Sequence, residues 1–101
     1  MNKYQYCKYV LTYDHRGNEI MRRFYDINGE PCIRDYGHSA SVKKYDERNN
    51  LLQVVYYDTK MKPINNDDGF SKIIYTYTDN YKSCTRKYYD IYGKLVKEEK
   101  E

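Results

Sequence analysis

A step of 32 residues organises this chain. An aromatic residue, a tyrosine and an aspartate at 24–26 return as the same three residue types at 56–58 and again at 88–90. Apolar positions recur in the same register, among them Val10, Val42 and Ile74. A fixed period of this size indicates stacked supersecondary units, each too small to bury its own apolar face. We therefore expect a tandem-repeat protein.

Each repeat contains residues that favour tight turns. Asp26 and Gly29 stand first and fourth in a four-residue segment, which suits a type I turn: the Asp side chain accepts a backbone N–H, and Gly adopts a left-handed conformation without steric cost. The other turn-shaping residues are identified by the same two properties, an Asp acceptor or a Gly that can adopt the left-handed conformation. The full set that we expect to shape turns is Asp14, Gly17, Asp26, Gly29, Asp58, Asp90 and Gly93.

The turn pattern weakens at three positions. Asn49 replaces Gly17 one repeat later, and Asn is the next best residue for a left-handed conformation. Met61 and Tyr81 fit such a position poorly. At those two points the sequence predicts a different loop or backbone strain.

Short runs rich in Tyr, Val, Ile and Thr lie between the turns, at 9–13, 51–57 and 73–77. These residues favour strands, and no segment shows sustained helical periodicity. We predict one all-β domain spanning 1–101, built from tandem 32-residue β-hairpin repeats with polar links between them. The hairpins are expected at about 8–26, 40–58 and 71–90. They would stack as a twisted antiparallel sheet or a short β-solenoid, and a small β-barrel or sandwich is the alternative.

Alternation along each strand divides the side chains between two faces of the sheet. The second hairpin is the most apolar and is expected at the centre of the core, because it contains Leu51, Leu52, Val54 and Val55. The side chains assigned to the core are Val10, Val42, Ile74, Ile20, Leu52, Phe24, Tyr56 and Tyr88.

Composition narrows the class of protein. A mean hydropathy of −1.10 is low, and a charged fraction of 33% is high, for a chain that forms a compact core. The 15 tyrosines can compensate, because each can bury a large ring while its hydroxyl stays hydrogen-bonded. The cysteines Cys7, Cys32 and Cys84 are odd in number and lack zinc or redox spacing. No apolar stretch suggests a signal peptide or a membrane span. We expect no metal, no cofactor and no membrane association.

The cysteines and the absence of an apolar signal stretch also indicate a cellular compartment. A chain without a signal peptide and without cysteines close together in the sequence fits a reducing cytoplasm if this sequence is complete. A segment excised from a longer secreted protein would instead be extracellular or at the cell surface.

The phrases at 13–18 and 25–29 resemble the tyrosine-aspartate (YD) repeats of RHS-type bacterial proteins. That resemblance implies strand-and-turn modules that build large β-structures, usually on surfaces or in secreted toxins. The phrases at 56–58 and 88–93 are also similar to the aromatic hairpins of bacterial cell-wall-binding repeats, in which aromatic side chains between neighbouring hairpins hold choline or glucan. The 32-residue period is longer than is typical of either family, and Trp is absent.

These observations favour a non-catalytic module that acts in structure or protein–protein interaction. It would be part of a larger array or an oligomer formed through edge strands, because an unpaired aromatic edge invites another chain. The alternative is a module that binds a carbohydrate or another small ligand in tyrosine pockets between hairpins. The candidate ligand-binding residues are Tyr25, Tyr57, Tyr89, Tyr13, Tyr45 and Tyr77.

Other functions have weaker support. The basic pair Arg22 and Arg23 lies beside aromatic residues, as in single-stranded nucleic-acid sites, but alternation splits the pair across two faces and the net charge is only +3. One Asp per turn supplies too few oxygens for calcium. His15 and His38 do not recur as histidines, and we expect a lone His in a polar loop to be solvated. No residue set with a catalytic mechanism is present, so an enzyme is not expected.

Overall fold

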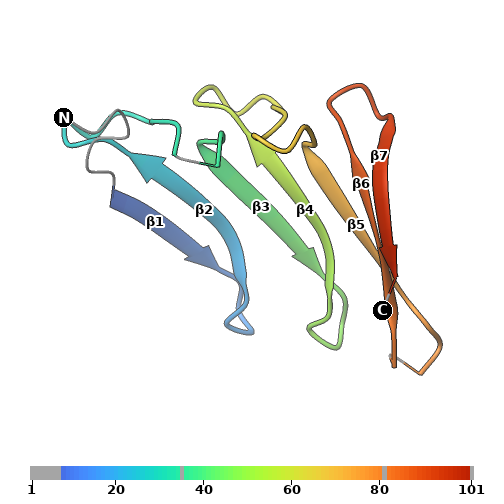
Figure 1. Cartoon of the computed structure of the whole chain (residues 1–101). Helices are drawn as coiled ribbons and strands as arrows, with labels where there is room; N and C mark the ends of the chain where they lie inside the picture. Colours follow the sequence, from blue (N-terminus) through green and yellow to red (C-terminus); the bar gives the residue numbers. More distant parts are fainter. Residues whose placement is uncertain (1–7, 35, 81, 101) are drawn as a thin grey trace.

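Seven β-strands follow one another across a single twisted sheet (Figure 1). The computed structural model describes residues 8–34, 36–80 and 82–100. The strands are β1 (Lys8–Tyr13), β2 (Glu19–Tyr25), β3 (Ala40–Tyr45), β4 (Leu51–Tyr57), β5 (Lys72–Tyr77), β6 (Cys84–Tyr89) and β7 (Leu95–Lys100). Each strand pairs antiparallel with its neighbour in sequence, so the order in the sheet is the order in the chain.

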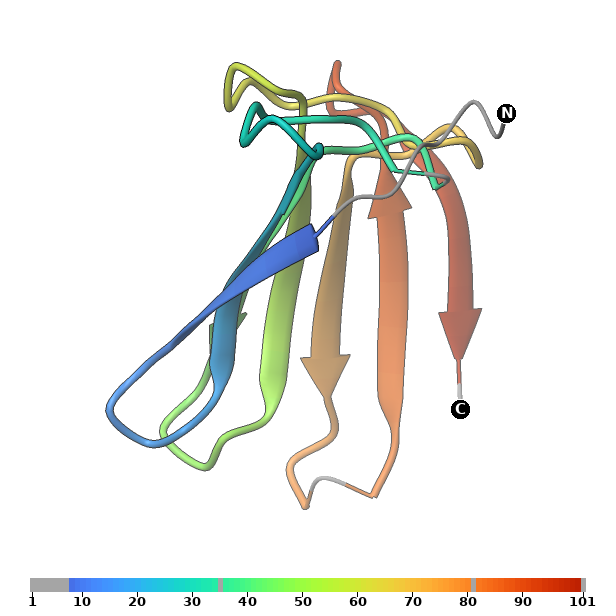
Figure 2. The same cartoon turned by 90° about the vertical axis from the view of Figure 1, so that its left-hand side faces the viewer.

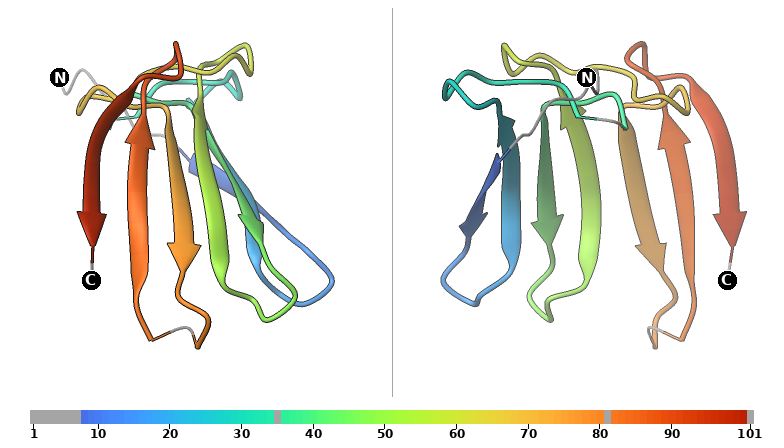
Figure 3. Two further views of the ribbon diagram at one scale, coloured as in Figure 1. Left: turned by 90° about the vertical axis from the view of Figure 1, so that its right-hand side faces the viewer. Right: turned by 60° about the vertical axis from the view of Figure 1, so that its left-hand side comes forward.

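The sheet is open, with β1 at one edge and β7 at the other (Figure 3). The first six strands form the three predicted hairpins, β1–β2, β3–β4 and β5–β6. The prediction of stacked antiparallel hairpins is therefore confirmed, and the barrel alternative is wrong.

Five turns share one hydrogen-bonding pattern. In each, an Asp carboxylate oxygen accepts the backbone N–H groups two and four residues later, at 2.8–3.0 Å. These aspartates are Asp14, Asp26, Asp46, Asp58 and Asp90. The fourth residue of each turn has a positive φ, and at Met61 that angle is 61°. The turn at Met61 therefore has the same form as the others, and its backbone is strained because a side chain is disfavoured in the left-handed region. Tyr81 lies outside the described residues.

The links between hairpins lie at the opposite end of the sheet from the tight hairpin turns (Figure 2). Each link first bridges the strand that precedes it, through Tyr25 and Pro31 in one case and Tyr57 and Pro63 in the other. A further turn then brings the chain back to the sheet, where the next hairpin starts. The contact at Pro31 is thus a single bridge and not an additional strand.

The returning end of each link inserts a ring between two strand rings. His38 lies 5.7 Å from Phe24 and 4.7 Å from Tyr56 between ring centroids, and Phe70 lies 6.0 Å from Tyr56 and 4.7 Å from Tyr88. We call these five residues the aromatic row. The expectation that His38 is solvated is wrong, because the link folds back and leaves only 8% of the residue exposed.

The core differs from the predicted set of side chains. Phe24 and Tyr88 are buried as expected, and Tyr56 is half-buried in the aromatic row. Ile20, Val42 and Ile74 are only half-buried, whereas Val10 and Leu52 are exposed. The side chains that form the buried cluster around Tyr88 are Val54, Phe70 and Ile73.

Two causes explain the misassigned core residues. In the pairing of β4 with β5, Ile73 lies opposite Val54, so Ile74 points to the other face. A register shift between Lys44 and Tyr45 leaves Leu52 without a cross-strand partner, and Leu51 packs against the cluster instead. Sequence alternation alone does not reveal either the covered face or the bulge.

The segment after Gly93 is a strand, whereas the segments after Gly29 and Met61 are links between hairpins. Leu95 occupies the repeat position of Pro31 and Pro63, and it pairs with Tyr89 at the start of β7. Because Leu has the backbone N–H that Pro lacks, the segment can continue as a strand. Lys97 then lies over the ring of Tyr88, 4.6 Å from its centroid. β7 thus covers the end of the aromatic row.

Candidate functional site

Two of the six predicted ligand-binding tyrosines, Tyr45 and Tyr77, lie at the contacts between neighbouring hairpins. We call the contact between β1–β2 and β3–β4 the first junction, and the contact between β3–β4 and β5–β6 the second junction. Tyr45 donates its hydroxyl to the carbonyl of Glu19 at 2.9 Å, and Tyr77 donates to the carbonyl of Leu51 at 2.6 Å. Both acceptors lie 26 residues before the donor. The same tyrosine position therefore joins the hairpins at both junctions.

Tyr13, the corresponding residue of the first hairpin, is 54% exposed on the edge strand β1. It is thus more exposed to solvent than Tyr45 and Tyr77, which are half-buried. The three residues predicted as one set lie in two different environments.

Tyr25, Tyr57 and Tyr89 end the second strand of each hairpin and are half-buried. The backbone carbonyls of Tyr57 and Tyr89 accept the N–H groups of Ser39 and Ser71, at 2.9 and 2.8 Å. Side-chain cations lie over two of the rings, the Arg23 guanidinium over Tyr25 and the Lys72 amine over Tyr89. These tyrosines therefore contribute to strand pairing and cation–π contacts.

A similar surface cavity occurs at each junction. At the first junction a cavity of about 440 Å³ is lined by Asp14, Ile20 and Tyr45, together with the stems of β3 lysines. At the second junction a cavity of about 370 Å³ is lined by Asp46 and Leu52 with Tyr77. The two sets of residues are related by the 32-residue step, so a tyrosine, an aliphatic side chain and an aspartate recur together.

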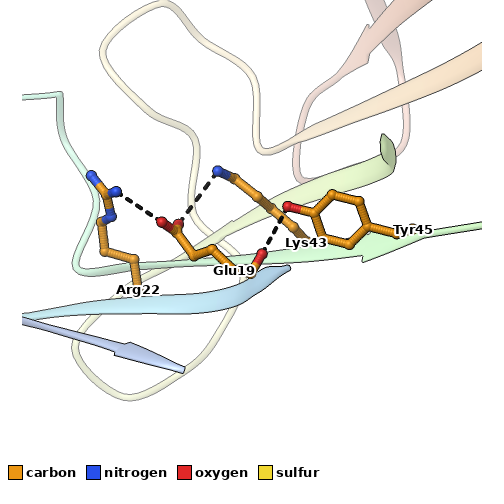
Figure 4. A network of polar contacts seen from close by, with 4 residues as sticks. All are labelled: Glu19, Arg22, Lys43 and Tyr45. Carbon is orange, nitrogen blue, oxygen red and sulfur yellow. Dashed lines mark hydrogen bonds and ion pairs between the residues drawn. The ribbon is translucent and has the colours of Figure 1, made fainter. Parts of the chain in front are cut away.

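A polar network crosses the first junction (Figure 4). The Glu19 carboxylate accepts a hydrogen bond from Arg22 at 2.9 Å and forms an ion pair with Lys43 at 3.4 Å. Burial raises the pKa of Glu19, but the hydrogen bond from Arg22 and the charge of Lys43 outweigh it, so the net pKa is lowered. Glu19 is therefore a carboxylate at neutral pH and is already paired with cations of its own chain.

The tyrosine hydroxyls near the aromatic row are weak acids. Burial, with a hydrogen bond to Glu99, raises the pKa of Tyr88 to about 12. Burial and a 2.7 Å hydrogen bond to Asp68 also raise the pKa of Tyr36. Burial likewise raises the pKa values of Tyr56 and Tyr75. These hydroxyls remain protonated at neutral pH, where they can donate hydrogen bonds.

The described residues can be searched for a metal-binding cluster and for a membrane-spanning helix. Within 8–34, 36–80 and 82–100, no group of three or more His, Cys, Asp or Glu side chains is placed to hold a metal ion. The same part of the chain contains no helix that is long and apolar enough to cross a membrane.

Sequence reasoning missed the link residues of the site. His38 and Phe70 are 32 residues apart, and both are ring-bearing residues that precede a strand. That spacing was the available signal, but the two residue types differ and the link was treated as a polar loop. Glu19 and Lys43 gave no signal, because Leu51 and Tyr75 occupy their positions one repeat later.

Comparison with known proteins gives no family assignment. No protein-family model matches the chain, and no match was found among curated proteins or among solved structures.

Proposed function

We propose that this chain is a non-catalytic β-repeat module that acts in structure or protein–protein interaction and assembles through its edge strands. The observation that carries the proposal is the use of the repeated tyrosines. Tyr45 and Tyr77 donate their hydroxyls to the backbone of the preceding hairpin, at 2.9 and 2.6 Å. The most regular feature of the sequence thus serves to attach one hairpin to the next.

The form of the sheet supports this proposal. Every strand pairs only with its sequence neighbours, and the same junction occurs twice, so a further hairpin can add without altering the others. The sheet also ends in two strands whose outer backbone groups face no strand of the described chain. Such edges are the usual places where one β-protein pairs with another.

The test is the solution mass of the chain over a wide range of concentration, measured by light scattering on a sizing column. We expect a mass that rises with concentration above the 12.3 kDa of one chain. A mass of one chain at every concentration would contradict self-assembly through the edges.

A second candidate function has one specific observation in its favour. The repeated cavities at the two junctions combine an aromatic ring, an aliphatic side chain and a carboxylate, a set that suits a carbohydrate or another small polar ligand. A panel of glycans and oligonucleotides, titrated by calorimetry, tests this candidate. Two equivalent sites per chain would support it.

A matched pair of variants would locate that binding. Leu52 lines the second cavity and is 36% exposed, so Leu52→Glu should remove one of the two sites while the fold is kept. Thr85→Glu, on β6 and not among the residues that line either repeated cavity, is the control. Unchanged stoichiometry in Leu52→Glu would contradict the ligand-binding candidate.

We also propose that the protein is located outside the cell or at the cell surface. Cys32 is disulfide-bonded, whereas Cys84 is a free thiol. Disulfides are common in oxidising compartments, which supports the extracellular or cell-surface alternative and agrees with the resemblance to surface YD repeats. Alkylation and mass spectrometry of protein isolated without reductant would test it. One disulfide per chain is expected, and three free thiols would contradict it.

A further inference from the structure

The edge strand β1 exposes side chains that are covered at the corresponding positions of the other hairpins. Tyr9 is 55% exposed and Val10 is 50% exposed. One and two repeats later, the position of Tyr9 is held by Ser41 and Ile73, which are both 7% exposed. These two residues pair with a strand of the preceding hairpin. β1 therefore has the surface of a junction strand but no preceding hairpin in the described chain.

The backbone of β1 is also arranged for pairing. The carbonyl of Ser39 accepts the N–H of Phe24 in β2, and the carbonyl of Ser71 accepts the N–H of Tyr56 in β4. Because backbone direction alternates along an antiparallel strand, Ser41 presents its N–H and C=O groups to the preceding hairpin as well. The corresponding residues of β1 are Tyr9 and, two residues later, Leu11. Their backbone groups point away from β2.

The opposite edge has a different character. β7 has the sequence Leu-Val-Lys-Glu-Glu-Lys, and Lys97 and Glu99 are engaged with Tyr88 and Arg86 of its own sheet. Charged residues on an edge strand disfavour pairing with another chain. β1 has the sequence Lys-Tyr-Val-Leu-Thr-Tyr and contains one charged residue. The two edges therefore differ in their tendency to associate, and β1 is the one open to a partner.

We propose that β1 pairs antiparallel with β1 of a second copy of this chain, about a two-fold axis centred on Leu11. The inference rests on the proposed function, which it sharpens by naming the edge, the partner and the register. Antiparallel pairing is favoured because all six strand pairs of the sheet are antiparallel. A contact in which each copy uses the same strand is closed, so it produces a dimer.

The register follows from side chains and charge. A pairing centred on Leu11 places Tyr9 opposite Tyr13 of the second copy, and Val10 opposite Thr12. It also places Lys8 opposite Asp14 of the second copy, a pair of opposite charge that occurs twice because of the symmetry. Residues directly opposite one another in such a pairing share a face and contact each other. The ring of Tyr9, which lies 6.3 Å from Phe24, would thus extend the aromatic row toward the second copy.

The first experiment compares two valines on the two edges. Val10 in β1 and Val96 in β7 are 50% and 45% exposed, so Val10→Lys and Val96→Lys are matched substitutions. Light scattering of the full chain should show a monomer–dimer equilibrium. Val10→Lys should raise its dissociation constant by at least about tenfold, because two charges are introduced near the two-fold axis. Val96→Lys should leave the constant unchanged, and circular dichroism confirms that both variants are folded.

The second experiment tests the register in which β1 pairs with β1 of the second copy. Leu11→Cys in a Cys84→Ser background places two thiols directly opposite each other, at a Cα separation of about 5.5 Å that suits a disulfide. Mild oxidation should give a covalent dimer on a non-reducing gel. Val96→Cys in the same background is the control and should give none.

Each outcome has a separate meaning. Dissociation by Val96→Lys but not by Val10→Lys would overturn the β1 inference and leave edge-strand assembly intact. A dimer that fails to cross-link through position 11 would overturn the register proposed here, and species larger than a dimer would overturn the closed pairing. A monomer at every concentration would overturn both this inference and the self-assembly on which it rests.

Discussion

The two junctions have the same backbone contacts and different side chains. At both, a tyrosine at the end of a strand donates to a carbonyl 26 residues earlier, and a strand pairs through three residues with the preceding hairpin. The side chains that fill the space differ at five equivalent positions. From the first junction to the second they change as Glu19 to Leu51, Arg22 to Val54, His38 to Phe70, Ser41 to Ile73 and Lys43 to Tyr75.

This exchange makes the first junction polar and the second apolar. The buried cluster of Val54, Phe70, Ile73 and Tyr88 lies entirely at the second junction. The first junction relies on the Glu19 network and on the ring of His38. Strand pairing and one tyrosine hydrogen bond therefore define the junction, whereas several kinds of side chain can fill it.

The largest expected effect tests the apolar junction. Phe70 is 3% exposed and contacts the rings of Tyr56 and Tyr88, so Phe70→Ala should lower the free energy of unfolding by about 3–5 kcal/mol. Chemical denaturation measures this loss. Ser41→Ala is the small-residue control at the first junction and should cost far less. A loss below about 1 kcal/mol for Phe70→Ala would show that the second junction is not the main source of stability.

The links that lead into the two junctions begin with the same turn but with different residues. Gly29 has a φ of 83°, so Gly29→Val should cost about 1–2 kcal/mol, the usual penalty for a side chain in the left-handed region. Met61 has a φ of 61°, and Met61→Gly should therefore not destabilise the domain. Thermal melting of both variants measures the difference. Equal effects of the two substitutions would contradict the shared turn.

The tyrosine hydrogen bond should have a similar value at both junctions. Tyr45→Phe and Tyr77→Phe each remove a hydroxyl donor and keep the ring, so each should cost about 0.5–1.5 kcal/mol. Tyr13→Phe is the control and should leave the melting temperature of the monomer unchanged, because Tyr13 is exposed. A loss confined to one junction would show that the two contacts are not equivalent.

The smallest effect distinguishes the polar junction by its pH dependence. The pKa of Glu19 is lowered in the folded chain, so its contribution is present above the pKa of the unfolded state and is lost as the pH falls through the folded value. Glu19→Gln should cost about 0.2–1 kcal/mol at pH 7, because the ion pairs are partly exposed, and less at pH 3, where the carboxylate begins to be protonated. Denaturation at both pH values, with added salt as a second probe, measures this. A cost that does not change with pH would contradict the ion-pair assignment.

Local features predicted the hairpins well. Asp26 and Gly29 mark a turn because one residue supplies an acceptor and the other a left-handed backbone, and both effects act within four residues. The 32-residue step, with strand-forming residues between turns, then predicts stacked antiparallel hairpins. The predicted tyrosine positions were also informative, since Tyr45 and Tyr77 hold the junctions together.

The tertiary structure decided which side chains the fold covers. A strand of alternating residues has two faces, and local chemistry does not determine which one a distant link will cover. His38 is buried because its link returns over Phe24, and Leu52 is exposed because a bulge between β3 and β4 turns Leu51 inward in its place. Likewise, the segment at Leu95 becomes a strand because it can pair with β6 and place Lys97 over Tyr88. The repeat, the turns and the strands can be predicted from residue types and their spacing, since those features depend on neighbours along the chain. The core and the contacts made by the two edge strands depend instead on segments far apart in the sequence, so they follow from tertiary packing.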